Sequence, residues 1–196
     1  MANKYLSQKA LIKIVTIAML SAVSFVLFLL EFPVIPSLSH LKLDFSDVPA
    51  LISGVIFGPL SAVTVELVKN IIELLVKGVG TQMGYGNIMN FIVGCAYVVP
   101  FCIVYRKFDK SGKKDKGILL GSVTGIAVIV GVGILANYFI APLFFKHFLG
   151  IQLDSAGIWA AVWGATAVNA IKGVMLSVIS LPVIKVLIER LQKFVR

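Results

Sequence analysis

Residues 158–188 read IWAAVWGATAVNAIKGVMLSVISLPVIKVLI, a long apolar stretch with Lys172 near its middle. About 20 apolar residues are enough for a helix to cross a bilayer, so this stretch predicts a transmembrane helix. A lysine at that depth costs roughly 2.5–3.5 kcal/mol on insertion scales and is expected to face a polar cavity or a partner. Asn169, one turn earlier, lies on the same helix face. The two residues predict either a ligand-binding patch or a lysine paired with a carboxylate of another helix.

The rest of the chain has the composition of an integral membrane protein. Of its 196 residues, 59% are hydrophobic and 14% are charged, and the mean hydropathy is +0.99. A soluble domain cannot bury that much apolar surface. The length suits a single membrane domain over residues 1–196, without a soluble catalytic module. The net charge of +9 lies in clusters between apolar spans, which does not predict a nucleic-acid-binding surface.

Six apolar stretches predict six transmembrane helices, in an all-α integral membrane bundle. They cover about residues 10–30, 48–57, 60–76, 87–105, 118–141 and 158–188. The first stretch follows lysines, as in a signal peptide, but it is long and no small-residue cleavage site follows it. We therefore expect it to be retained.

Lysine and arginine residues predict the orientation of the bundle. Most of them lie in the N-terminal segment, in residues 106–116 and at the C-terminal end, whereas the intervening loops hold only Lys42, Lys77 and Lys146. The positive-inside rule then places both termini in the cytoplasm.

Catalytic and metal-binding motifs are absent from the sequence. There is no G-x-x-x-x-G-K-[ST] phosphate loop, no H-E-x-x-H, no G-x-S-x-G and no cluster of His, Cys and Asp. Cys95 and Cys102 lie within one apolar span and are interpreted as small core residues. The sequence therefore predicts a binding protein, with no metal site and no enzymatic activity.

The third span carries a ladder of polar residues on one side of its helix, namely Glu66, Lys69, Asn70, Glu73 and Lys77. Opposite charges at these spacings can pair, which lowers the cost of facing the bundle. The ladder is interpreted either as structural or as the proton site of a secondary carrier that uses Glu66 and Glu73.

The loop before the second span alternates apolar and polar residues from Leu41 to Asp47, which predicts an extended segment. Asp47 is a candidate cap for the second helix, and Pro49 suits its first turn. The segment either lies across the bundle mouth as a lid or only connects two helices.

Four motifs together resemble the S components of energy-coupling factor (ECF) transporters, specifically the riboflavin-binding type. They are A-x-x-x-A at Ala18 and Ala22, LKLDFSDVPAL at 41–51, ANYF at 136–139 and NAIK at 169–172. The first motif is common to many S components, whereas the last two are more specific for the substrate. The resemblance covers nearly the whole chain; an S component for another vitamin is the alternative.

The resemblance implies a multi-pass subunit in a bacterial plasma membrane that captures riboflavin as a transported substrate, without a cofactor. It implies a transmembrane coupling subunit and two ATP-binding-cassette ATPases as partners, with Ala18 and Ala22 at the contact. Asn137, Asn169 and Lys172 match the positions that hold the isoalloxazine ring. The 41–47 segment, with Leu43, Asp44 and Phe45, would cover the vitamin, and Tyr85 is a further candidate wall. Asn137 must lie at the depth of Asn169, which requires the fifth helix to tilt or to extend beyond Ala141.

Overall fold

The computed structural model describes residues 2–34, 41–78 and 84–188, which form a bundle of helices with one small hairpin. The helices are α1 (Ala2–Leu29), α2 (Asp47–Phe57), α3 (Pro59–Lys77), α4 (Tyr85–Asp109), α5 (Lys114–Phe148) and α6 (Ser155–Pro182), followed by the π-helix η3 (Val183–Ile188). Two short antiparallel strands, β1 (Phe32–Pro33) and β2 (Lys42–Leu43), form the hairpin. The predicted class, an all-α membrane bundle, is confirmed.

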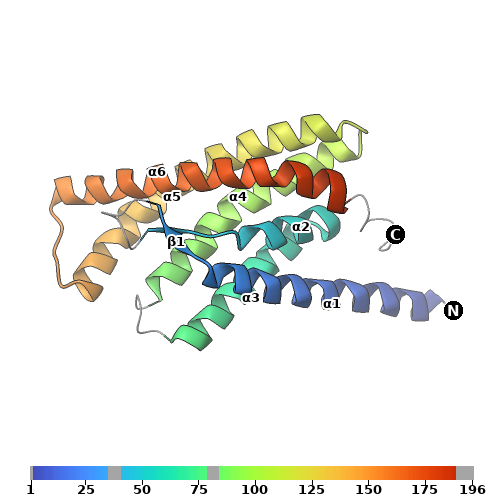
Figure 1. The fold of residues 1–196 in the computed structure, drawn as a ribbon, viewed down its shortest axis with the longest axis horizontal. Helices are drawn as coiled ribbons and strands as arrows, with labels where there is room; N and C mark the ends of the chain where they lie inside the picture. The colour runs from blue at the N-terminus through green and yellow to red at the C-terminus, as the bar shows by residue number, and fades with distance from the viewer. Residues whose placement is uncertain (1, 35–40, 79–83, 189–196) are drawn as a thin grey trace.

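Four helical segments are long and apolar enough to cross a membrane: Gln8–Leu29, Tyr85–Asp109, Lys114–Phe148 and Ser155–Val186. The other two helices differ from them. α2 is apolar but has only 11 residues, and α3 carries the charged ladder on its buried face. Figure 1 shows α2 beginning about midway along the bundle, so that the β2 strand leads into the interior.

α4 and α5 pack closely along a row of small residues that the sequence analysis did not single out. Gly117, Gly121 and Gly125 of α5 face buried aromatic residues of α4; a β-carbon at Gly125 would lie 2.8 Å from the Tyr97 ring. Small residues at this spacing let two helix backbones approach each other in a membrane. The aromatic rings beneath them, Tyr97 and Phe101, stack with a centroid separation of 5.9 Å. This seam positions α5 in the bundle.

The junction between α2 and α3 is held by α4. Gly58 turns the chain with φ of 113°, a conformation that L side chains rarely adopt. Arg106 of α4 donates hydrogen bonds to the Val55 and Ile56 carbonyl oxygens at 3.2 and 3.3 Å. These carbonyls end a helix and lack intrahelical partners, so the arginine caps α2.

One end of the bundle gathers the basic segments. The beginning of α1, the turn between α4 and α5, and η3 all lie at this end (Figure 1). There Lys185 pairs with Asp115 at 2.9 Å. The helix ends around the hairpin lie at the opposite end.

Candidate functional site: a cavity with a buried ion network

A cavity of about 440 Å³ lies between the hairpin and α1, α3, α4, α5 and α6. Five of the predicted site residues line it: Asp44, Tyr85, Asn137, Asn169 and Lys172. Its apolar walls include Met89, Val93, Ile140, Phe144 and Val168. The volume falls within the range of pockets for small organic ligands, and an apolar lining with a few polar groups is typical of them.

Leu43 and Phe45 are not among the lining residues, whereas Leu41, Lys42 and Asp44 are. Leu43 is buried, and the Phe45 ring packs against Phe32 with a centroid separation of 6.2 Å. Successive side chains of an extended segment point to opposite sides. From Lys42 onward, the register of β2 therefore turns Lys42 and Asp44 toward the cavity and the two apolar residues away from it, whereas Leu41, before the strand, also lines the cavity.

Asn137 and Asn169 line the same cavity, and α5 continues to Phe148, beyond the predicted end at Ala141. Asn137 donates to the Gly133 carbonyl oxygen at 2.8 Å. A β-carbon at Gly133 would collide with the Asn169 amide nitrogen, so the glycine makes room for this side chain. Asn169 is buried, and its amide nitrogen has no hydrogen-bond partner among the described residues. It is a donor available to a ligand.

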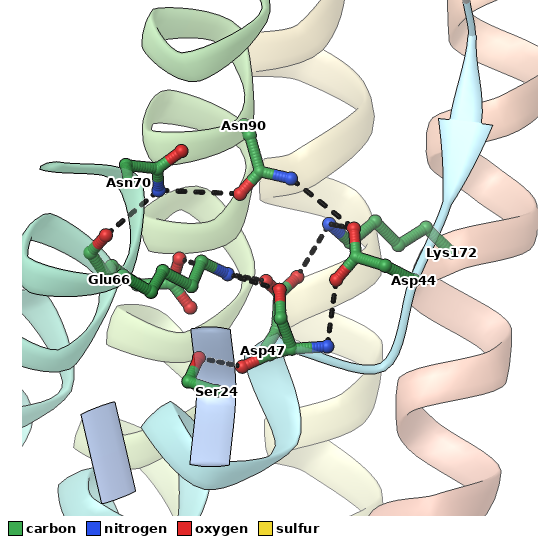
Figure 2. A network of polar contacts seen from close by, with 9 residues as sticks. Ser24, Asp44, Asp47, Glu66, Asn70, Asn90 and Lys172 are labelled. Carbon is green, nitrogen blue, oxygen red and sulfur yellow. Dashed lines mark hydrogen bonds and ion pairs between the residues drawn. The ribbon is translucent and has the colours of Figure 1, made fainter. Parts of the chain in front are cut away.

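Lys172 lines the cavity and is also paired with carboxylates (Figure 2). Its Nζ atom lies 2.9 Å from Asp47 Oδ2 and 3.6 Å from Asp44 Oδ2. Lys69 of α3 approaches the other Asp47 oxygen at 2.5 Å. Asp47 thus joins α2 to both α3 and α6. The sequence allowed two interpretations of Lys172, a donor that faces a cavity and a partner in an ion pair. In the structure Lys172 is both.

The predicted capping role of Asp47 is wrong. The N-cap residue of α2 is Ser46, which makes no capping hydrogen bond through its side chain. Asp47 is the first helical residue, and the two lysines occupy its carboxylate. The ion pairs with α3 and α6 therefore replace the local cap.

The chain around Ser46 is fixed from several helices. Ser24 of α1 donates to the Ser46 carbonyl oxygen at 2.5 Å, and the Ser46 amide donates to Asp44 at 2.7 Å. Asn90 of α4 donates to the other Asp44 oxygen at 3.3 Å, as Figure 2 shows. The inner end of the 41–47 segment is therefore part of the bundle interior.

At the mouth of the cavity, Glu31 joins the hairpin to α3. Its carboxylate accepts from Lys42 of β2 at 2.8 Å and from Lys77 of α3 at 3.1 Å. On the other side of the mouth, the Tyr85 hydroxyl and His147 Nδ1 lie 2.9 Å apart. These contacts border the cavity at the end of the bundle that lies opposite the basic segments.

The charged ladder of α3 forms as its spacing predicts. Glu66 lies 2.7 Å from Lys69, and Glu73 lies 3.0 Å from Lys77.

Two polar residues of α4, Asn87 and Asn90, also line the cavity and were not predicted from the sequence. Asn87 donates to the Glu73 carboxylate. Their one-turn spacing within an apolar span was the signal that could have identified them.

Ala18 and Ala22 lie on the outer face of α1, away from the cavity. Both are exposed, whereas Ser21, Ser24 and Phe28 of the same helix are buried. The outer face offers small residues to another helix.

The chain is similar to members of a known protein family. The family described as "ECF transporter, substrate-specific component" matches residues 12–184. The riboflavin transporter FmnP of Bacillus subtilis (strain 168) is 35% identical over 169 residues, which cover 85% of this chain and 87% of FmnP. The riboflavin transporter RibU of Staphylococcus aureus (strain TCH60) is 31% identical over 185 residues, covering 94% and 92%.

A solved structure shares the fold. The chain described under "Structure and mechanism of the S component of a bacterial ECF transporter" superimposes with a TM-score of 0.69 at 29% identity. The match covers 94% of the present chain and 97% of that chain.

Proposed function

This chain belongs to the family of substrate-specific components of ECF transporters, and we propose that it is the subunit that captures riboflavin for such an importer. It is a multi-pass bacterial membrane protein and not an enzyme, since the family and the relatives are transporter components. The observation that carries the proposal is the cavity with Asn137, Asn169 and Lys172 on its wall, in a chain similar over most of its length to riboflavin transporters.

The polar wall matches the chemistry of a flavin. The pyrimidine edge of the isoalloxazine ring alternates carbonyl acceptors with an imide N–H donor. An asparagine amide offers both an acceptor and donors, and a lysine ammonium carries three protons. Lys172 forms ion pairs with Asp47 and Asp44 and also lines the cavity, so its ammonium can donate to a ring carbonyl. The dimethylbenzene end suits the apolar walls, where Val93, Ile140 and Phe144 lie.

The proposed topology is a single domain over residues 1–196 with six membrane segments and both termini in the cytoplasm. The basic segments gather at one end of the bundle, as the positive-inside rule requires of a cytoplasmic side. The cavity lies toward the other end, where Glu31, Lys42 and Lys77 line it, which supports entry of the vitamin from outside. α2, α3 and the hairpin would then lie within the membrane.

The proposed partners are a transmembrane coupling subunit and two ATP-binding-cassette ATPases, because the sequence lacks a phosphate loop of its own. Riboflavin would be the transported substrate rather than a cofactor. Glu66 and Glu73 are each paired with a lysine, which favours a structural ladder over a proton-coupled carrier.

The protein alone is expected to bind riboflavin. Titration of the protein in mild detergent should quench flavin fluorescence at a stoichiometry of about one, because the bound ring would lie in a cavity that Tyr85 lines, and a nearby tyrosine quenches an excited flavin. Thiamine and biotin are the controls and should not compete. Binding of either one, in a protein that does not bind riboflavin, would identify a component for another vitamin. Accumulation of riboflavin by this chain alone in proteoliposomes with a proton gradient would instead support the carrier.

Replacement of Ala18 or Ala22 by tryptophan is expected to block assembly with the coupling subunit, because the added bulk keeps the partner helix at a distance. Riboflavin binding should change by less than about threefold, since both positions lie outside the cavity. Ala127→Trp is the matched control, as Ala127 is exposed on α5. Co-purification of the partners, expressed together, measures assembly; normal yields with both α1 variants would place this face in lipid.

A further inference from the structure

The polar cluster around Asp47 contains more carboxyl groups than ammonium groups. Asp44, Asp47 and Glu66 are all buried, and the lysines that face them are Lys69 and Lys172. The other polar groups that face the cluster are neutral: Ser24 and Ser46, Asn70 of α3, and Asn90 and Cys95 of α4. With every group ionised, the cluster carries one negative charge in an apolar interior, which is strongly unfavourable.

The three carboxyl groups differ in the hydrogen bonds that they accept and in the ion pairs that they form. Asp47 has one ammonium at each oxygen, at 2.5 and 2.9 Å. Asp44 accepts from the Ser46 amide at one oxygen and from Asn90 at the other, and it opens on the cavity.

Glu66 has the weakest set of partners. Its Oε2 atom forms an ion pair with Lys69 at 2.7 Å, but neither of its carboxyl oxygens has a hydrogen-bond partner among the described residues. Lys69 donates its hydrogen bonds to Ser46 and Asp47 instead.

The surroundings of Glu66 leave little room for a hydrated ion. The side chain is completely buried, and it packs against Gly94 of α4. A β-carbon at Gly94 would lie 2.5 Å from Oε2 and 2.8 Å from the carboxyl carbon. The smallest positive charge that balances the cluster is a proton.

We propose that Glu66 is a proton-binding site and carries this proton as a neutral carboxylic acid. The cluster of two carboxylates and two lysines is then neutral, and Asp47 keeps both of its ion pairs. The inference goes beyond vitamin capture and does not depend on it. The bound proton serves as a fixed structural counter-charge and is not a coupling ion.

Infrared spectroscopy of the wild-type protein in detergent tests the proposal without any ligand. We expect a carbonyl band of a protonated carboxylic acid that shifts on ¹³C-glutamate labelling and disappears in Glu66→Gln. Glu73→Gln is the matched control on the same helix and should keep the band. Because glutamine resembles the neutral acid, Glu66→Gln should shift the melting temperature by no more than a few degrees.

A second variant tests the charge balance itself. Asp47→Asn removes one carboxylate, so Glu66 should release its proton and the band should disappear although Glu66 is intact. A missing wild-type band, a band that survives in Glu66→Gln or in folded Asp47→Asn, or failure of Glu66→Gln to fold would each overturn the proposal. Stability that depends on sodium, in a protein without the band, would assign the counter-charge to a metal ion instead.

Discussion

Replacement of Lys69 by methionine is expected to destabilise the protein by about 3–5 kcal/mol, which is the usual cost of removing one partner from a buried ion pair. Lys69 is fully buried and contacts Ser46, Asp47 and Glu66 at 2.5–2.7 Å. Methionine fills similar space but leaves Asp47 with a single ammonium. Denaturant titration of the protein in detergent, followed by circular dichroism, measures the loss.

Lys185→Met is the control for this measurement. Lys185 also forms an ion pair, at 2.9 Å to Asp115, but the two side chains are 53% and 79% exposed. Exposed pairs contribute about 0–1 kcal/mol, so this variant should be close to wild type. Equal losses in the two variants would mean that the buried network contributes no more than a surface pair.

Replacement of Lys172 by alanine is expected to weaken riboflavin binding by about 1.5–3 kcal/mol, the range for a hydrogen bond to a charged group. This corresponds to roughly ten- to a hundredfold in the dissociation constant. Asn169→Ala should cost somewhat less, since a neutral amide bond is weaker and water can replace it. The double variant should be non-additive, because residues one turn apart would hold one ring. Fluorescence quenching by monodisperse protein provides the measurement.

The ion pairs of Lys172 require a separate control for folding. Its removal also leaves Asp47 with one partner fewer, so the melting temperature of each variant must be measured without ligand. Lys146→Ala is the matched binding control, because Lys146 is exposed and is not among the cavity-lining residues. Wild-type affinity in a folded Lys172→Ala variant would leave the lysine with a purely structural role.

Local sequence patterns predicted the parts of the fold that depend on neighbours in the chain. The apolar stretches predicted the four helical segments of the described residues that are long and apolar enough to cross a membrane, whereas the count of six spans stays a prediction. The three- and four-residue spacings predicted the ladder Glu66–Lys69 and Glu73–Lys77. Both follow from helix periodicity, because residues one turn apart meet on one face. The alternation in residues 41–47 similarly predicted an extended segment, but it did not show which of its two sides faces the cavity.

The glycine seam of α5 and the end of that helix were harder to predict. Gly121 and Gly125 reveal a close contact only when Phe101 and Tyr97 are seen beneath them. The predicted span ended at Ala141. In the structure α5 continues through Pro142 to Phe148, and Asn137 and Asn169 line the same cavity.

The sequence by itself determined that the chain is a bundle of membrane helices, that Asn169 and Lys172 share one face, and that α3 pairs its own charges. These properties depend on composition and on spacings of a few residues. Only the tertiary structure decided that Lys172 and Lys69 share Asp47, that α2 begins inside the bundle, and that Lys42 and Asp44 rather than Leu43 and Phe45 face the cavity. The physical reason is that a buried lysine can pair with any carboxylate that the packing brings within reach, and the strand register follows from contacts with helices far away in the chain.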